Sequence, residues 1–341
     1  MKTACRRSES GVRRQAGYVL LLVLSTVAVL AFVVGEFAHR IDQLRKNAGL
    51  LQDYSRGRIA AAGAYAASGY WLATRPNEPL GLGDVRGLVR ADGRLYRFGP
   101  DAYISFQDLR SMLSLNMPDR LALQRLLIND GVPYERTDAY IDTLLDYTEV
   151  TPLKRLNGAS LADYEGLGLP APRRDWLRSY HELGNMPFWS EDPRRIERLQ
   201  NSLAVRRSDW INPNTATEPV LRALFPLAAP EQIQRLLQLR QTAGFYTARA
   251  AALATGLDFD REIFLPYVGP ELQITVWAKG LPRAIQYNVL IVPGGFDGPW
   301  LVTELHSKNR PNLPDDAIDL PVFPLEAAAT GRYPQVDSGQ P

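Results

Sequence analysis

The feature that most constrains this chain is an uncharged apolar run near its N-terminus. From Ala16 to Gly35 the sequence holds 20 residues without a charged side chain, most of them Val, Leu or Ala. A helix rises about 1.5 Å per residue, so this run spans about 30 Å, the thickness of the hydrocarbon core of a bilayer. It therefore predicts a single membrane-spanning helix, and the rest of the chain must fold outside the membrane.

Basic residues before the apolar run set its expected orientation. The residues up to Gly17 contain one acid, Glu9, and five basic side chains, Lys2, Arg6, Arg7, Arg13 and Arg14. The positive-inside rule then keeps the N-terminus in the cytoplasm and exports the bulk of the chain, to the periplasm or the cell exterior. Two alternatives stay open: a plain uncleaved anchor, and a secretory signal peptide cut beyond Phe37. The signal peptide fits less well, because the run is longer than the usual apolar region and residues 36–42 hold only a weak cleavage signal.

Composition indicates ordinary globular material attached to this anchor. The chain has 341 residues, 45% of them hydrophobic and 22% charged, which leaves room for two modest domains. The formal charge of +2 becomes −2 without residues 1–17, so nothing in the charge balance favours nucleic acid as a partner. The single cysteine, Cys5, also lies in this leader, so a chain without the leader cannot form disulfides.

A long helix is expected to continue beyond the membrane. No proline occurs between Tyr18 and Arg75, and apolar residues recur at three-or-four-residue spacing as far as Gly69. We therefore expect one helix with a transmembrane part, 18–36, and a periplasmic part, 37–75. The small residues of 60–69 would let its second half lie close against a sheet.

The remaining sequence predicts strands on both sides of a large helical segment. We expect the first strands over 76–105, with a hairpin turn at Asp92-Gly93, and the remaining strands over 258–307, at 272–278, 284–292 and 300–305. The helical insert between them covers 106–257, with helices at 106–115, 118–130, 137–148, 192–205, 218–225, 230–242 and 248–255. Residues 308–341, rich in proline, predict a flexible tail. The expected fold class is α+β: a long N-terminal transmembrane helix packed on an antiparallel sheet, with an all-helical domain inserted between the strands.

The junction between the basic residues and the apolar run, with Gly17 followed by Tyr18, resembles the class III leader of type IV pilins and pseudopilins. In that family the prepilin peptidase cuts after a glycine and the new N-terminal residue is methylated, which here implies a cut between Gly17 and Tyr18. The family usually has Glu at the fifth mature position, where this chain has Leu22. The K-class minor pseudopilins of type II secretion also lack this Glu and are assigned to the tip of the fibre. A carboxylate in the bilayer core is costly unless it is paired, and a tip subunit has no partner ahead of it.

The body of the chain also resembles the K class, from Gly17 to about residue 305. Four stretches carry the resemblance, and they lie at 138–149, 157–164, 179–188 and 211–216, the last reading Ile-Asn-Pro-Asn-Thr-Ala. The resemblance implies a pilin-like fold and a non-enzymatic minor pseudopilin in the bacterial inner membrane, single-pass. Its implied role is in a tip complex that initiates and caps the periplasmic pseudopilus used in protein secretion. The implied partners are the I, J and H minor pseudopilins, the major pseudopilin, the prepilin peptidase and the inner-membrane secretion platform.

Some K-class proteins bind calcium in the helical insert, through acids near two of these stretches. Calcium requires six to eight oxygens, several of them from carboxylates. In this chain Asp146 and Glu149 remain, whereas Thr151 and Ser160 stand where acids are expected. We therefore expect no tight calcium site and no other cofactor. The acids of this helix, Asp138, Asp142, Asp146 and Glu149, would then form a solvent-exposed face.

An alternative function is DNA binding and uptake, or adhesion, by a helix-hairpin-helix module within 205–257. Such modules bind phosphate through the backbone N–H groups of a glycine-rich hairpin. Here the hairpin, 225–230, lacks glycine and contains two prolines, which have no N–H. We therefore expect a scaffold with no nucleic-acid site, and Arg235, Arg240 and Arg249 as surface cations.

The sequence predicts neither an enzyme nor a metal site. The three histidines, His39, His181 and His306, lie far apart in the sequence, without the spacing of a helix-borne zinc site. The chain contains no nucleophile elbow and no Walker loop, and no cysteine follows the leader.

Overall fold

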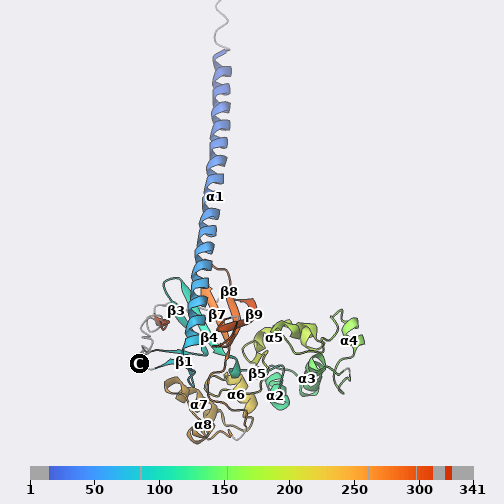
Figure 1. Ribbon diagram of the computed structural model, residues 1–341. Helices are drawn as coiled ribbons and strands as arrows, with labels where there is room; N and C mark the ends of the chain where they lie inside the picture. Colours follow the sequence, from blue (N-terminus) through green and yellow to red (C-terminus); the bar gives the residue numbers. More distant parts are fainter. Residues whose placement is uncertain are drawn as a thin grey trace, which may run out of the picture. The chain divides into compact units, whose positions relative to one another are not determined.

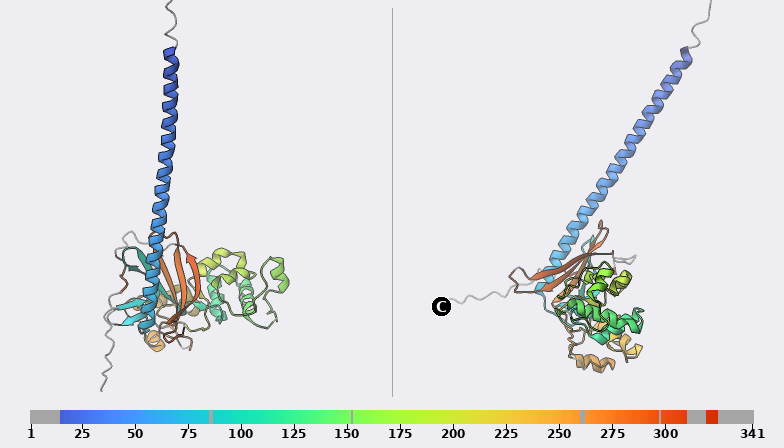
Figure 2. Two further views of the ribbon diagram at one scale, coloured as in Figure 1. Left: turned by 45° about the horizontal axis from the view of Figure 1, so that its top comes forward. Right: turned by 90° about the vertical axis from the view of Figure 1, so that its right-hand side faces the viewer.

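The computed structural model describes residues 15–84, 87–151, 153–259, 262–296, 298–309 and 319–324. The chain forms two compact units, Met1–Arg56 and Gly57–Pro341. Figures 1 and 2 show the elements of both units. Residues 1–14, which make up most of the leader 1–17, lie outside the described residues.

Helix α1, Gln15–Thr74, supplies the described part of the first unit. From Tyr18 to Arg56 its side chains are exposed, apart from the half-buried Ile41. Within the described residues it is the one helix that is long and apolar enough to cross a membrane. Two hydroxyls in this segment bond back to the helix itself: Ser25 Oγ and Thr26 Oγ1 donate to the carbonyl of Leu22 at 2.9 and 3.0 Å. The backbone therefore satisfies the polar side chains of the apolar segment, as a lipid environment requires.

The second unit is built on a five-stranded antiparallel sheet in the order β3-β4-β7-β8-β9. The strands are β3, Asp92–Phe98; β4, Ala102–Asp108; β7, Glu271–Ala278; β8, Ala284–Ile291; and β9, Trp300–Lys308. The last three lie where the alternating sequence predicts them. Together with α1 and the helical insert, this sheet confirms the expected α+β class.

The C-terminal end of α1 packs on this sheet. Ala61, Ala64, Trp71 and Leu72 are buried in a core shared with the strands. Two glycines of α1 permit the close approach: a Cβ at Gly69 would lie 2.7 Å from the ring of Trp300, and one at Gly57 would collide with the carbonyl of Lys279. The small residues over 60–69 thus have the packing role that the sequence predicts.

The predicted hairpin at Asp92-Gly93 is wrong. Strand β1, Gly81–Asp84, pairs with β2, Gly87–Arg90, and β3 pairs with β4 instead of β2. Gly93 has a positive φ of 83°, but it lies in an irregularity at the start of β3, where the register with β4 shifts. Asp92 binds Arg90 and Arg94 there. The Asp-Gly pair, which predicts a turn, therefore lies at a register irregularity instead, because tertiary contacts decide which strands pair.

The chain leaves the sheet after β4 and returns at β7, and the insert between them has its own hydrophobic core. Its helices are α2, Arg120–Asn129; α3, Tyr134–Thr148; α4, Leu161–Gly166; α5, Pro193–Leu199; α6, Glu218–Leu224; α7, Pro230–Thr242; and α8, Ala248–Thr255. Short 3₁₀ turns are η1, Leu109–Ser111; η2, Tyr180–Asn185; and η3, Trp189–Glu191.

The insert is not entirely helical. Strands β5, Leu113–Ser114, and β6, Leu203–Ala204, form a two-stranded parallel sheet, and the helix predicted over 192–205 ends at Leu199. The helix predicted over 106–115 is also wrong, because residues 106–108 complete β4. There Phe106 pairs with Ile274 and Asp108 with Leu272, and pairing with β7 outweighs the helical spacing of the local apolar residues.

Part of the expected flexible tail is docked on the sheet. Of residues 308–341, the structure describes Lys308, Asn309 and 319–324. Phe323 is 2% exposed and packs against the rings of Trp71, Phe98 and Phe106. The backbone beside it is fixed too, because Arg97 donates to the carbonyl of Pro321 and accepts from the N–H of Phe323. This segment thus differs from the prediction, and the remaining tail lies outside the described residues.

Candidate functional site

The three residues singled out in the N-terminal segment lie in the first turns of α1. Gly17 and Tyr18 follow the helix start at Gln15, and Leu22 lies one turn after Tyr18. Tyr18 is 73% exposed and Leu22 53%, and their apolar neighbours are exposed as well. The segment thus presents an uncharged, largely apolar surface, and position 22 adds no charge to it.

The motif Ile-Asn-Pro-Asn-Thr-Ala at 211–216 forms a buried joint between the insert and the sheet. Asn212 Nδ2 donates to Asp108 Oδ2 at 2.9 Å, and Thr215 Oγ1 donates to the same oxygen at 3.1 Å. The other oxygen, Oδ1, accepts the backbone N–H groups of Arg110 and Gly269. Asp108 is fully buried, and this burial raises the pKa of its carboxyl despite these hydrogen bonds. Asp108 carries no functional signal in the sequence, where it falls within the helix predicted over 106–115.

The second asparagine of the motif holds the chain on its way back to the sheet. Asn214 Nδ2 donates to the carbonyls of Phe245 and Pro266 at 2.9 and 3.0 Å, and its Oδ1 accepts the N–H of Phe245. We call the network of Asp108, Asn212, Asn214 and Thr215 the buried joint. All four side chains have partners within the fold, so the motif serves to connect the two parts of the unit.

Of the four acids expected to form a solvent-exposed face, Asp138 and Glu149 are partly exposed, whereas Asp142 and Asp146 are not. The side chains of Asp142 and Asp146 are only 5% and 10% exposed. Arg120 pairs with Asp142 at 2.7 Å and with Asp138 at 2.6 Å. Burial opposes ionisation of Asp142, but hydrogen bonds from Arg120 and Asn157 outweigh it and lower the pKa of this carboxyl.

Arg155 occupies the space between the two acids that the sequence analysis considered for calcium. Its guanidinium lies 2.8 Å from Asp146 and 2.6 Å from Glu149, and its backbone N–H also donates to Asp146. Gly158 packs so tightly on Asp146 that a Cβ would collide with its carboxylate. The chain therefore supplies its own cation to these carboxylates.

In the helix-hairpin-helix segment, α6 to α7, one of the three predicted surface cations binds backbone carbonyls inside the fold. Arg240 donates to the carbonyls of Ala216 and Pro213, and burial lowers its pKa to about 10. The expectation that it is a surface cation is therefore wrong, whereas Arg235 and Arg249 are exposed. Nothing in this arrangement favours the DNA-binding alternative.

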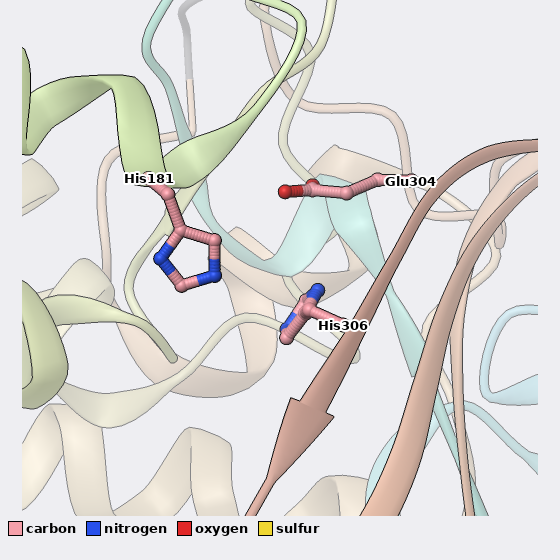
Figure 3. A group of neighbouring side chains, drawn as sticks. All are labelled: His181, Glu304 and His306. Carbon is pink, nitrogen blue, oxygen red and sulfur yellow. The ribbon is translucent and has the colours of Figure 1, made fainter.

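Two of the three histidines, although distant in sequence, lie together beside a carboxylate (Figure 3). One ligand atom each of His181, Glu304 and His306 lie within 4.8 Å of one another, and the two imidazole rings meet edge to face at 5.3 Å. We call these three residues the histidine cluster. His181 comes from η2 in the insert, whereas Glu304 and His306 lie two residues apart on one face of β9.

Local structure positions each member of the histidine cluster. Ser179 caps η2, and its Oγ donates to Glu304 Oε1 at 2.6 Å, which links the insert to the strand. Asn288 donates to Glu304 Oε2 at 2.8 Å. Gln200 lies 3.2 Å from Nε2 of His306, whereas Nδ1 of that ring is buried without a hydrogen-bond partner among the described residues. The i, i+2 spacing on β9 is a sequence signal for two of the three members, Glu304 and His306, but nothing in the sequence signals the approach of His181.

The comparisons with known proteins point to one family. Residues 211–260, which begin with the motif of the buried joint, match the family model "Type II secretion system (T2SS), protein K". No curated protein matches the chain. Among solved structures, a chain of the GspK–GspI–GspJ complex from enterotoxigenic Escherichia coli matches with a TM-score of 0.50 and 14% sequence identity. The match covers 80% of this chain and all of that chain, so the two share their fold.

Proposed function

We infer that this chain, which belongs to the type II secretion system protein K family, works as a minor pseudopilin of that system. The observation that carries this function is the combination of the family motif with a pilin-like architecture. The motif itself forms the joint between the helical insert and a sheet on which the end of α1 packs. Its work is assembly, and we propose no catalytic role.

We propose that the subunit occupies the tip of the pseudopilus, where it initiates and caps the fibre. Leu22 supports this position, because an apolar residue there needs no charged partner from a subunit ahead of it. The insert supports it as well. Its own core and the buried joint make it a rigid body attached to the sheet, large enough to obstruct the addition of a further subunit.

The proposed partners follow from this position. The matched Escherichia coli chain comes from the GspK–GspI–GspJ complex, and we propose the corresponding I and J minor pseudopilins as direct partners here. The H class, the major pseudopilin, the prepilin peptidase and the secretion platform complete the proposed set. The apolar helix anchors the chain in a membrane, which we propose to be the inner membrane, with a cytoplasmic N-terminus and a periplasmic body.

Mass and N-terminal sequence of the protein, recovered from membranes of a host with an active prepilin peptidase, test the processing. A chain that begins at methylated Tyr18 supports the proposal, as does copurification with I and J pseudopilins. An intact Met1, or a cut beyond Phe37, would contradict the pilin-type leader and with it the tip assignment.

Replacement of Leu22 tests the tip position itself. We expect Leu22→Glu to leave cleavage intact but to reduce secretion several-fold, because an unpaired carboxylate in the bilayer costs about 3 kcal/mol. Leu22→Met, which preserves an apolar side chain, is the matched control and should secrete normally. Normal secretion by the Leu22→Glu variant would remove the argument for a tip position while leaving the family unaffected.

A further inference from the structure

We propose that the histidine cluster is a binding site for one divalent transition-metal ion of the Zn²⁺ class, which fastens the helical insert to the edge of the sheet. The ion would take one ring nitrogen each from His181 and His306 and one carboxylate oxygen from Glu304. It would join η2 in the insert to β9, the last strand of the sheet.

A small side-chain movement would bring the three ligand atoms to the distances of a tetrahedral site. The three ligand atoms lie within 4.8 Å of one another. Zn²⁺ bonds to nitrogen and oxygen are about 2.0–2.2 Å long, which places tetrahedral ligands about 3.4 Å apart. His181 is exposed and can close the remaining gap by a small side-chain rotation, while Glu304 and His306 are fixed on β9.

The ligand types select the class of ion. Two imidazoles and one carboxylate suit Zn²⁺ and its neighbours, whereas Ca²⁺ and Mg²⁺ prefer sites made of oxygens. Three protein ligands leave a fourth position for water, which the exposed His181 keeps open to solvent.

Hydrogen bonds from neighbouring residues already orient the ligand side chains, as they do around the ligands of known metal sites. Glu304 Oε1 accepts from Ser179 Oγ and from the N–H of Tyr180. Among the described residues, Oε2 accepts a hydrogen bond from Asn288 alone and keeps a lone pair for an ion. On His306, Gln200 holds Nε2, and the unpaired nitrogen is the buried Nδ1. A bound ion would give this nitrogen the partner it lacks, and a rotated Gln200 amide would accept the Nε2–H.

Zinc titration of the full-length protein in detergent, without a polyhistidine tag and after treatment with a chelator, tests the site. We expect isothermal titration calorimetry to show one Zn²⁺ bound per chain, and the affinity to fall at least tenfold in the His181→Gln and Glu304→Gln variants. His39→Gln is the matched control, because the third histidine lies on α1 and contacts Gln43 there. Its affinity for Zn²⁺ should equal that of the unaltered protein.

Two further measurements connect binding to geometry. Co²⁺ in place of Zn²⁺ should give the visible absorption of a tetrahedral ion, and this band should be absent in His181→Gln. Added Zn²⁺ should slow hydrogen exchange in η2 and β9 together. Circular dichroism should show that His181→Gln, altered at an exposed position, retains the fold.

Three outcomes would overturn the proposal. The first is no Zn²⁺ binding by the unaltered protein, and the second is binding that His181→Gln and Glu304→Gln leave unchanged. The third is an equal loss of affinity in His39→Gln, which would place the ion elsewhere. None of these outcomes bears on the pseudopilin function, which rests on the family motif and on α1.

Discussion

Two of the polar contacts that join the helical insert to the sheet are built in opposite ways. In the buried joint, Asp108 accepts hydrogen bonds at both oxygens and is closed to solvent. In the histidine cluster, His181 is exposed and Nδ1 of His306 has no partner among the described residues. A saturated buried network fixes one arrangement of the chain, whereas an unsaturated cluster at the surface retains capacity for a ligand.

Removal of Asp108 should produce the largest effect. In Asp108→Ala, the donors of Asn212 and Thr215 and two backbone N–H groups lose this buried charged acceptor. We therefore expect the free energy of unfolding to fall by about 3 kcal/mol. Chemical denaturation followed by tryptophan fluorescence would measure it.

The matched control for this variant is Asp101→Ala. Asp101 lies on the surface and pairs with Lys279 at 3.4 Å, so its removal should cost no more than about 0.5 kcal/mol. Equal losses in the two variants would show that the buried joint does not stabilise the fold.

Acid titration should give smaller effects of opposite sign at Asp108 and Asp142. Burial raises the pKa of Asp108, so the folded state holds its proton more tightly and the contribution of Asp108 to stability falls as the pH rises above about 3.9. At Asp142 burial is outweighed by Arg120 and Asn157, which lower the pKa. Its stabilisation is therefore present above about pH 3.9 and lost as the pH falls through the lowered pKa.

The unfolding free energy of Asp108→Asn and Asp142→Asn between about pH 3 and pH 7 would test this contrast. Relative to the unaltered protein, Asp142→Asn should lose less stability on acidification. Asp108→Asn should lose less stability on the rise from acidic to neutral pH. Identical pH profiles in the two variants would contradict the opposite shifts.

The smallest effect is expected at the histidine cluster when no metal is present. His181 is exposed, so His181→Gln in the presence of a chelator should change the free energy of unfolding by no more than about 0.5 kcal/mol. With Zn²⁺ at about a hundred times its Kd, the unaltered protein should gain about 2.7 kcal/mol and the variant much less. A large loss in chelator alone would mean that the cluster stabilises the fold without an ion.

Sequence patterns predicted those features whose cause is local. The uncharged run predicted α1, and alternation predicted β7, β8 and β9. The predicted strand ends agree with the structure to within about one residue, except at the end of β9. The Ile-Asn-Pro-Asn-Thr-Ala motif marked the family, and its match at 211–260 agrees with that reading. The pattern shows these polar residues but not their acceptor, Asp108. That residue lies over 100 residues earlier, in a stretch whose spacing predicts a helix but which forms a strand.

The features that could not be predicted depend on contacts between distant residues. Phe323 docks on the sheet although its neighbours in sequence resemble a tail. His181 meets His306 only because η2 folds against β9, and no spacing within the sequence encodes that approach. The acids of α3 likewise look like a solvated face until Arg155 folds back on Asp146.

The way the insert departs from the sheet and rejoins it has a consequence for how such a protein can change. Strands β4 and β7 are antiparallel neighbours, and Asp108 at the end of one lies opposite Leu272 at the start of the other. Antiparallel neighbours can be joined by as few as about two residues. Topologically, residues 109–270 therefore replace the short turn of a β-hairpin. A change in the length or sequence of this connection can leave the register between β4 and β7 unaltered.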